Sequence, residues 1–541
     1  MLRRCLWIVI AGLGFLAAFD STAFAQNKID EMSLDRWKLL REAERHQMNV
    51  AEKYYRERQF KIALGEYEKF VVLYEKSEGT SFAQLKWAIC QIHLKKINTA
   101  ISEGFQTVID YWPDSPEASI AAFYIGHCYK QTGEIKKAKK AYLQAVSKYE
   151  SSLAAVYSLT DLLDVADLEA DVEGKVATWR KLVYDIKRTP GEGNNLCVQA
   201  SVQLATHYFS TGNAAEGVAA LDTSYKGNSR PYHVWYYCRT PIGQLTADAK
   251  TKEKGEKVAD GCVVAIRERI PTDLSKPEDK TNAREWSYYA ADVLAHSRRE
   301  DKVVEAYQAM LRLYGQEDAT LQRFADWYKS IQKYDEARKL YGQFTNRIEG
   351  LNQTAYSYRQ QQKCDNAVTH YKQAAGLDSQ NIPKWNEQIA QAFREAGRWK
   401  EAIEAYTENL KIDVANTEKW LWAIAIAQRD GGMYKEAIGT FRQCTNFPEN
   451  TKQMAWCHRH LKEWNEAIIL YGQVTSSAPD APWALYQIAV VREASGDNEA
   501  AIRAYQTVCK KFPKDGHAAQ AHAHLQTKYK INVTLGGAAE E

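Results

Sequence analysis

The chain has 541 residues and a formal net charge of +3 at pH 7, and only 12 Pro and 29 Gly are available to interrupt helices. A charge this close to neutral argues against a general surface for nucleic acid or anionic membrane, which would need a strong basic excess. The 15 Trp and 32 Tyr are unusually many and require a structural or functional explanation.

The amino terminus has the features of an export signal. Arg3-Arg4 precedes an apolar run from Leu6 to Phe19, and Ala23-Phe24-Ala25 places small residues where a signal peptidase cleaves. The run is too short for a comfortable membrane span, and no cysteine stands at the cleavage point to carry a lipid. We therefore predict a signal peptide at residues 1–25 and a mature chain without a stable membrane span. It would be soluble in the periplasm or an equivalent extracytoplasmic lumen.

A short pattern recurs along the rest of the chain, in which a small residue is followed four positions later by an aromatic one. The segment Trp399-Lys-Glu-Ala402-Ile-Glu-Ala-Tyr406 has the same rhythm as Tyr434-Lys-Glu-Ala437-Ile-Gly-Thr-Phe441. Neighbouring copies are separated by roughly 30 to 38 residues, the range of two-helix repeats. Full copies are centred on Ala63, Ala138, Ala337, Ala367, Ala402, Ala437, Ala467 and Ala501. Val303 with Tyr307 is a variant, and Ala100 and Gly217 keep the small residue but lose the aromatic one.

A second small residue precedes each of these centres by twelve positions. Two helices that cross closely need small side chains at the contact, because larger ones would push the helix axes apart. The residues at this spacing are Ala51, Ala88, Gly126, Ala205, Ala291, Ala325, Ala355, Ala390, Ala425, Ala455 and Ala489. All eleven are Ala or Gly, whereas ordinary composition would give roughly one in six. The pattern predicts paired helices with close contacts at Ala88, Gly126, Ala390, Ala402, Ala425, Ala437, Ala489 and Ala501.

These motifs resemble the tetratricopeptide repeat. The unit Ala122 to Tyr149 has Ile125-Gly126, Tyr129, Gly133, Ala138, Tyr142 and Ala145 at the family's positions. It follows Tyr111-Trp-Pro113-Asp-Ser-Pro116, a turn similar to those of exported repeat proteins of the bacterial envelope. The resemblance implies an all-α, right-handed superhelical solenoid of antiparallel helix pairs, with about eleven recognisable repeats and one or two degenerate ones. The first helix of each pair would line a groove for partners, and most Tyr and Trp would fill contacts between helices.

The spacing of the repeats also suggests boundaries. We predict an N-terminal array at residues 26–225, an irregular insert or degenerate repeat at 226–283, a C-terminal array at 284–515 and a tail at 516–541. Residues 151–189 keep helical apolar spacing but lack the pair of small residues, which indicates a further degenerate unit.

No constellation of catalytic residues is recognisable. The sequence lacks a glycine-rich phosphate loop, a GxSxG elbow, an HExxH pair and a CxxC pair. Cys457-His458 could be a metal site, but Cys457 shares its repeat position with Cys90 and Cys128, which favours packing. His517, His522 and His524 could bind a divalent ion weakly or simply form a solvated helix end. A Cys444–Cys457 disulfide is compatible with an oxidising compartment. We predict no cofactor, no structural metal and no enzyme activity.

One repeat position carries a series of cations. The residue four places after the small residue of the first helix is Lys329, Arg359, Arg394, Arg429 and Arg459 in five successive units, and Trp422 and Trp456 stand beside them. Cations interleaved with aromatic rings suit the carboxylates of an acidic partner segment. The alternative is internal ion pairing to acids such as Glu387, Glu395 or Asp430, and the sequence leaves both open.

Three classes of function follow. The first is a non-catalytic scaffold or assembly factor that binds one or more proteins, and in its sharper form it organises subunits of a larger, polymeric enzyme complex. The second is a structural or cell-division-coordinating protein of the envelope. The third, an enzyme with an attached repeat domain, has little chain left to form a catalytic domain. We expect protein partners, not nucleic acid, and self-association is compatible with the sequence.

Overall fold

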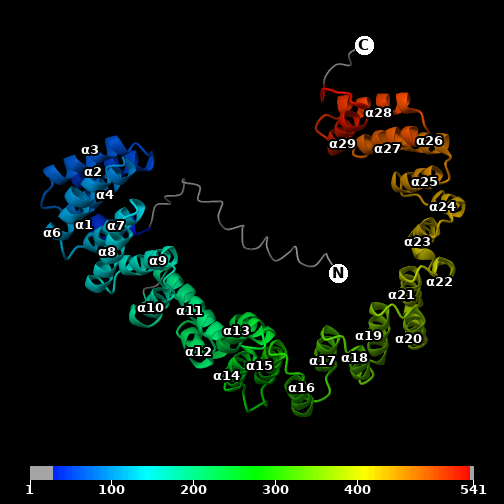
Figure 1. The fold of residues 1–541 in the computed structure, drawn as a ribbon, viewed down its shortest axis with the longest axis horizontal. Helices are drawn as coiled ribbons and strands as arrows, with labels where there is room; N and C mark the ends of the chain where they lie inside the picture. Colours follow the sequence, from blue (N-terminus) through cyan, green and yellow to red (C-terminus); the bar gives the residue numbers. More distant parts are fainter. Residues whose placement is uncertain (1–27, 189–190, 537–541) are drawn as a thin grey trace. The chain divides into compact units, whose positions relative to one another are not determined.

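The computed structural model describes residues 28–188 and 191–536, and this part of the chain consists of helices and the turns that connect them. It divides into two compact units, residues 1–306 and 307–541, whose boundary falls inside α16 (Glu300–Tyr314). The predicted signal peptide at 1–25 lies outside the described residues. Within the described ranges, no helix is long and apolar enough to cross a membrane. The prediction of an all-α stack of antiparallel helix pairs is confirmed (Figure 1).

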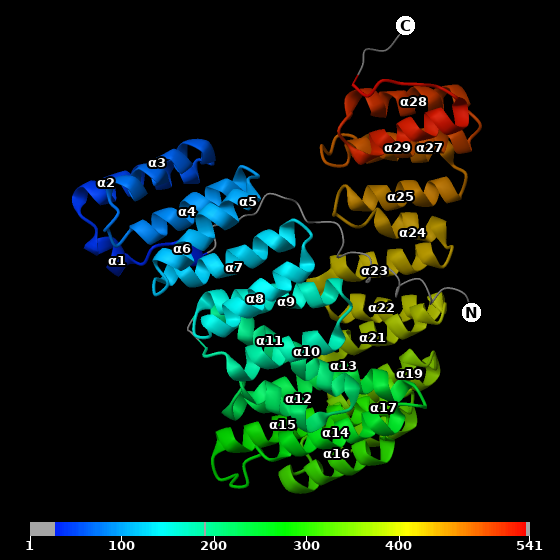
Figure 2. The ribbon, with the colours of Figure 1, turned by 60° about the vertical axis from the view of Figure 1, so that its left-hand side comes forward.

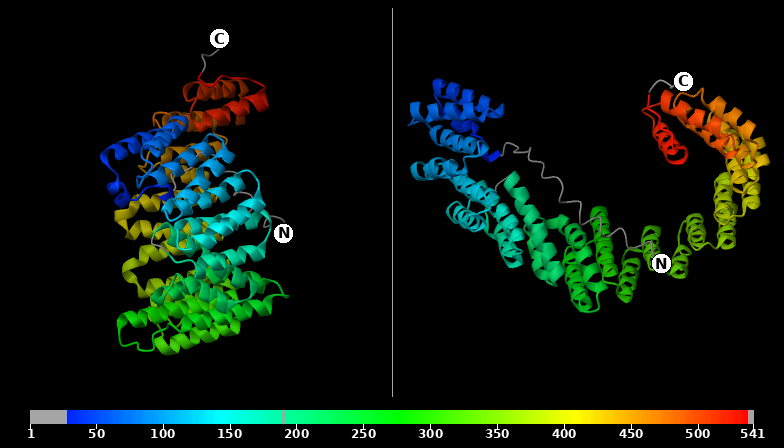
Figure 3. Two further views of the ribbon diagram at one scale, coloured as in Figure 1. Left: turned by 90° about the vertical axis from the view of Figure 1, so that its left-hand side faces the viewer. Right: turned by 45° about the horizontal axis from the view of Figure 1, so that its top comes forward.

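The first unit begins with a short 3₁₀ turn, η1 (Lys28–Asp30), and continues as helices that follow one another in layers (Figure 3). Its helices are α1 (Leu34–Leu39), α2 (Glu42–Arg56), α3 (Phe60–Leu73), α4 (Thr80–His93), α5 (Ile97–Thr99), α6 (Gln106–Tyr111), α7 (Pro116–Gln131), α8 (Ile135–Lys148), α9 (Leu153–Leu168), α10 (Val172–Arg180), α11 (Glu192–Thr211), α12 (Ala214–Asp222), α13 (Arg230–Ala247), α14 (Lys252–Arg267) and α15 (Pro277–His296). Two π-helical segments, η2 (Ala100–Phe105) and η3 (Lys181–Asp185), and the 3₁₀ turn η4 (Gly227–Ser229) complete it.

The second unit is more regular, and its helices lie one above another from α19 to α28 (Figure 2). They are α17 (Asp318–Ser330), α18 (Tyr334–Tyr341), α19 (Arg347–Gln360), α20 (Cys364–Leu377), α21 (Ile382–Glu395), α22 (Trp399–Ile412), α23 (Thr417–Asp430), α24 (Tyr434–Phe441), α25 (Glu449–His460), α26 (Trp464–Val474), α27 (Ala481–Ala494), α28 (Asn498–Lys511) and α29 (Gly516–His524). The 3₁₀ turns η5 (Ser379–Asn381) and η6 (Val414–Asn416) connect helix pairs, and the π-helical η7 (Leu525–Tyr529) follows α29.

The small residues found by the repeat pattern lie in the core. Ala390, Ala402, Ala425, Ala437, Ala489, Ala501 and Ala88 are all fully buried. In the five pairs from Ala355 to Ala501, the two small residues share an apolar cluster with the aromatic residue four places after the second, as Ala489 and Ala501 do with Tyr505. In the first unit, a Cβ added to Gly126 would lie 2.5 Å from the ring of Tyr142. The aromatic ring therefore occupies the space that a larger residue would need.

A left-handed residue ends the first helix of each recognisable pair. It stands seven positions after the small residue in all eleven pairs, and its φ is positive. Glycine supplies this conformation at Gly133, Gly212, Gly397, Gly432 and Gly496, whereas Arg58, Lys95, Arg298, Gln332, Gln362 and Lys462 adopt it with a side chain. This conformation reverses the chain in a tight turn, so that the second helix packs back on the first. The turn thus follows the same repeat as the core.

The segments that depart from the repeat are helical as well. Ala170 has the same left-handed conformation between α9 and α10, although Leu163 stands at the position of the small residue. Residues 226–283 contain α13 and α14, which pack against each other. The C-terminal tail forms α29 and η7, which bury Ala518, Ala521 and Leu525 against α28.

Candidate protein-binding site

The row of cations lies on the first helices of the second unit, and four of its five members have partners inside the chain. Arg359 on α19 forms an ion pair of 2.5 Å with Glu395 on α21. Arg394 on α21 approaches Asp430 on α23 at 3.4 Å. In both ion pairs the acid belongs to the first helix of the following repeat, five places after the small residue of that helix. We call this the ladder position. The hydrogen bond from Arg359 lowers the pKa of Glu395, which shows that the pair favours the charged carboxylate.

Lys329 and Arg429 are compensated within their own helices. Lys329 pairs with Asp326 at 2.8 Å, and Arg429 pairs with Asp430 at 2.6 Å. Their ladder positions in the next unit are Gln360 and His460, which are not carboxylates. The alternative of internal ion pairing therefore describes Lys329, Arg359, Arg394 and Arg429. It also holds for two of the three acids considered from sequence, whereas Glu387 pairs with Lys419 instead.

Arg459 differs from the rest of the row. The ladder position in its next unit is Ala494, which has no acceptor. Within residues 307–536, the guanidinium of Arg459 forms neither an ion pair nor a hydrogen bond, although the side chain is partly buried. Its guanidinium group has five N–H donors in a planar fork. It is therefore the member of the row whose charge is left for a ligand to neutralise.

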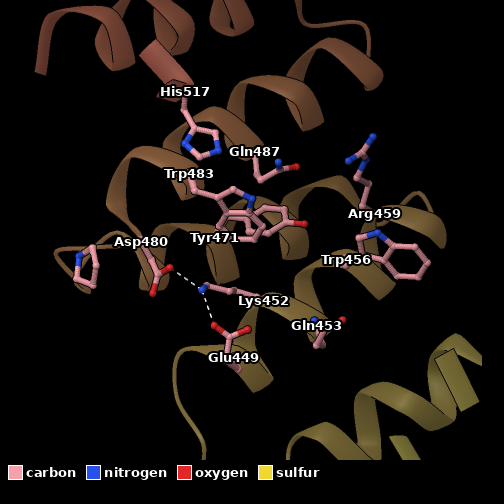
Figure 4. A pocket seen from close by; sticks show the side chains of 11 residues that line it. Glu449, Lys452, Gln453, Trp456, Arg459, Tyr471, Asp480, Trp483, Gln487 and His517 are labelled. Atoms are coloured by element: carbon pink, nitrogen blue, oxygen red, sulfur yellow. Dashed lines mark hydrogen bonds and ion pairs between the residues drawn. The ribbon is translucent and has the colours of Figure 1, made fainter. Parts of the chain in front are cut away.

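Arg459 lines a pocket of about 620 Å³ between α25, α26, α27 and α29. Figure 4 shows Arg459 and Trp456 side by side on α25, with Trp483 of α27 and His517 of α29 on the neighbouring wall. The lining residues are Glu449, Lys452, Gln453, Trp456, Arg459, Tyr471, Pro479, Asp480, Trp483, Gln487 and His517. The pocket thus combines one uncompensated cation with the faces of two indole rings.

The second cation of this pocket is already neutralised. Lys452 forms ion pairs of 2.6 Å with both Glu449 and Asp480 (Figure 4). Its ammonium also lies 5.2 Å from the centroid of the Trp483 ring. These contacts hold the Trp483 ring in place and leave Lys452 little capacity to bind a further anion. A carboxylate in the pocket would therefore be bound chiefly by Arg459 through a bidentate pair, with the indole rings flanking its carbon chain.

The structure brings together some of the residues predicted for the groove and separates others. Trp456 and Arg459 share the pocket, but Trp422 packs against Phe441 with ring centroids 5.2 Å apart and does not line it. Lys452, Trp483, Gln487 and His517 were missed by sequence reasoning. Lys452 stands three places before its small residue, the position of Trp422 in the preceding unit. The same rule applied one unit later would have found it.

The candidate metal and thiol sites are occupied by other interactions. The ring of His458 donates a hydrogen bond of 2.6 Å to the carboxylate of Glu463, His517 pairs with Asp515 and His524 with Glu493. Across the described ranges, no group of three or more His, Cys, Asp or Glu is arranged to hold a metal ion. The nine described cysteines, Cys444 and Cys457 among them, are free thiols. Burial raises the pKa of Cys457 to about 12, so this thiol is a packing residue and a poor nucleophile.

Comparison with known proteins assigns part of the chain. Models of the tetratricopeptide repeat match residues 122–147, 352–413 and 483–515. These segments contain the helix pairs of Gly126, of Ala355 and Ala390, and of Ala489, and the last one includes the Trp483 wall of the pocket. No curated protein matches the chain.

Three of the solved structures that match the chain have low sequence identity and low TM-scores. A chain of the APC/C hetero-tetramer Cut9-Hcn1 has 13% identity and a TM-score of 0.25, with 90% of this chain and 97% of that chain covered. A chain of Naa15/Naa10 bound to HypK-THB has 13% identity and a TM-score of 0.38, with 90% and 71% covered. Yeast Tom70 has 14% identity and a TM-score of 0.25, with 87% and 99% covered.

Proposed function

We propose that this chain is a non-catalytic scaffold that binds an acidic segment of a partner protein in the Arg459 pocket. The observation that carries the proposal is the single uncompensated guanidinium of the row, placed beside Trp456 and Trp483 in an open pocket. A partly buried charge without a counterion is costly, and a bound carboxylate removes that cost. The two rings add apolar contact on either side, as anchor residues of protein interfaces commonly do.

The cellular setting belongs to the same proposal. The signal-like sequence at residues 1–25 supports export to the periplasm or an equivalent lumen, where the scaffold would organise subunits of a larger enzyme complex. Fractionation of the native cells, followed by sequencing of the mature amino terminus, tests this part. Recovery of the protein in the cytoplasm with Met1 retained would contradict it.

The pocket is tested by a charge reversal with a matched control. Arg459→Glu should abolish recovery of the stoichiometric partner that copurifies with the tagged chain from its native cells. Arg442→Glu makes the same change at an exposed position after the second helix α24 and should leave that partner bound. Because Arg459 has no internal ion pair, both variants should melt within about 0.5 kcal/mol of the parent. Equal recovery of the partner by both variants would refute the pocket.

A further inference from the structure

Helix α4 is the first helix of the helix pair that contains Ala88, and it is buried on almost every side. Twelve of its 14 residues are buried, among them the unbroken stretch Thr80 to Lys86. In the second unit, the first helix α21 has the same length and buries only four residues. A first helix normally leaves the face toward the groove open, since only its neighbours in the stack cover it. Something other than the regular stack must therefore cover α4.

Part of the cover is the segment of residues 28–40, here called the strap. It begins with η1 and α1, and it buries Ile29 and Asp30, which are 6% and 4% exposed. The Asp30 carboxylate accepts hydrogen bonds of 2.8 and 2.9 Å from the hydroxyl of Tyr124 on α7. Farther along, Arg36 forms an ion pair with Glu117 on α7 and donates a 2.6 Å hydrogen bond to the carbonyl of Glu78.

The strap covers residues whose counterparts in the other unit line the open Arg459 pocket. Lys86 and Tyr124 each stand two places before the small residue of their first helix. In the second unit, the residues at this position are Gln453 and Gln487, and both line the Arg459 pocket. The face that is open to a ligand in one unit is therefore covered by the strap in the other.

The ammonium beneath the strap has an ion pair with Glu52 but no hydrogen bond to another described residue. Lys86 is fully buried, and its ammonium has no hydrogen-bond acceptor among the described residues. The ammonium lies 3.4 Å from the Glu52 carboxylate and 3.6 Å from the centroid of the Tyr55 ring. An ammonium has three N–H donors, and leaving them unused in a buried site is unfavourable. The charge of Lys86 lowers the pKa of Asp30, yet the two side chains form no ion pair among the described contacts.

The strap is also weakly held. None of the residues of α1 is buried, and Leu34 and Leu39 are 76% and 67% exposed. Burial raises the pKa of Asp30 to about 6 in spite of Tyr124 and Lys86, so the ionised carboxylate is poorly accommodated. The buried apolar residues of the strap are Ile29 at its start and Leu40 at its end, and the carboxylate of Asp30 is imperfectly compensated, so a better ligand can displace the part that contains Asp30.

We propose that the face of α2, α4 and α7 around Lys86 and Tyr124 is a second peptide-binding site, occupied in cis by Ile29-Asp30 of the strap. Its ligand is a partner segment in which an aliphatic residue precedes a carboxylate. Glutamate is preferred to aspartate, because one additional methylene brings the carboxylate closer to the unsatisfied ammonium of Lys86. The strap holds this site closed until such a partner displaces it. The site is independent of the Arg459 pocket and adds a regulated contact to the scaffold.

The competition is tested with the full chain and a fluorescent peptide that has the sequence of residues 28–33. Cis occupancy reduces apparent affinity by the fraction of open sites, so Asp30→Ala should bind the peptide at least about tenfold more tightly than the parent chain. Asp35→Ala removes a carboxylate of the same strap whose side chain is 96% exposed, and it should bind like the parent. Equal affinity of the parent and Asp30→Ala for the peptide would overturn the proposal.

Two further measurements identify the site itself. In the Asp30→Ala background, Tyr124→Phe removes the hydroxyl donor but keeps the ring, and it should weaken peptide binding about fivefold. A peptide with Glu in place of its Asp should bind several-fold more tightly. Arg459→Glu should leave this affinity unchanged, which separates the test from that of the pocket. Unchanged binding in the Tyr124→Phe variant, with an unchanged melting temperature, would show that the peptide binds elsewhere and would refute the site.

Discussion

The two ends of the described chain are both held by a carboxylate, and they are held differently. At the N-terminal end, Asp30 accepts hydrogen bonds from Tyr124 alone, while the nearby Lys86 ammonium stays without an acceptor. At the C-terminal end, Glu493 accepts hydrogen bonds from Tyr505 at 3.0 Å and Tyr529 at 2.8 Å, and it forms ion pairs with His524 and Lys528. One carboxylate thus has too few donors, and the other has several.

The pKa values of the two carboxyl groups express this difference. Burial raises the pKa of Asp30 to about 6. Burial alone would also raise the pKa of Glu493, but hydrogen bonds from Lys528, His524, Tyr529 and Tyr505 together lower it to about 2. Burial of a carboxylate therefore decides little by itself, since the number of donors determines whether the ionised form is favoured. We infer that the C-terminal contact is a permanent cap and that the N-terminal strap is displaceable.

We expect the largest effect from a substitution that removes the apolar anchor of the C-terminal cap. Leu525 is fully buried against α28 and α29, so Leu525→Ala should destabilise the cap by about 3 to 4 kcal/mol. Because each repeat contacts only its neighbours, the loss should appear as faster hydrogen exchange in α28 and α29. Leu535→Ala is the control, since Leu535 is 41% exposed and should change little. Similar exchange in both variants would mean that the tail is not a cap.

The next prediction concerns the pH dependence of the cap. Because the pKa of Glu493 is lowered in the folded state, its contribution is present above about pH 4.5 and is lost as the pH falls toward 2. Glu493→Gln should therefore cost about 3 kcal/mol at pH 7 and much less at pH 2.5. Thermal melting of parent and variant across this range measures the difference. A difference that stays constant with pH would contradict the assignment.

The pH dependence of the stability contributed by Asp30 should have the opposite sign to that of Glu493. Because the folded-state pKa of Asp30 is raised, its stabilising effect is complete below about pH 4 and is lost as the pH rises through 6. Asp30→Asn should stabilise the first unit by about 2 kcal/mol at pH 7 and have little effect at pH 4. The ionisable groups around it, all retained in the variant, are Glu31, Glu52, Tyr55, Lys86, Tyr124 and Tyr157. Destabilisation by Asp30→Asn at pH 7 would place Asp30 in a satisfied ion pair.

The smallest effects test the same contrast within the row of cations. Arg359 is paired with Glu395, and Arg359→Gln should cost about 1 kcal/mol, since that carboxylate is partly exposed. Arg459 has no partner, so Arg459→Gln should change the free energy of unfolding by less than about 0.5 kcal/mol. Urea titration of the two variants gives both values. If Arg459→Gln proved the more destabilising, Arg459 would have an internal role.

The repetitive part of the fold could be predicted from sequence because its contacts recur at fixed spacing. A small residue at Ala390 meets the same surroundings as one at Ala425, so one pattern specifies every helix pair. The register of Arg459 and Trp456 followed from the same rule. Even the absence of a partner for Arg459 can be traced to Ala494, which stands where the earlier units have Glu395 and Asp430.

The sequence by itself therefore determined the helix pairs, their close contacts and the helix face on which the cations lie. Only the tertiary structure decided which of these cations are neutralised, because an ion pair depends on side chains of a neighbouring unit and their distances. It alone also placed the strap, whose Asp30 meets Tyr124 from 94 positions away. That contact is not part of the repeat, so the periodic pattern in the sequence does not predict it. It depends on how a non-repetitive segment packs across helices that are already assembled.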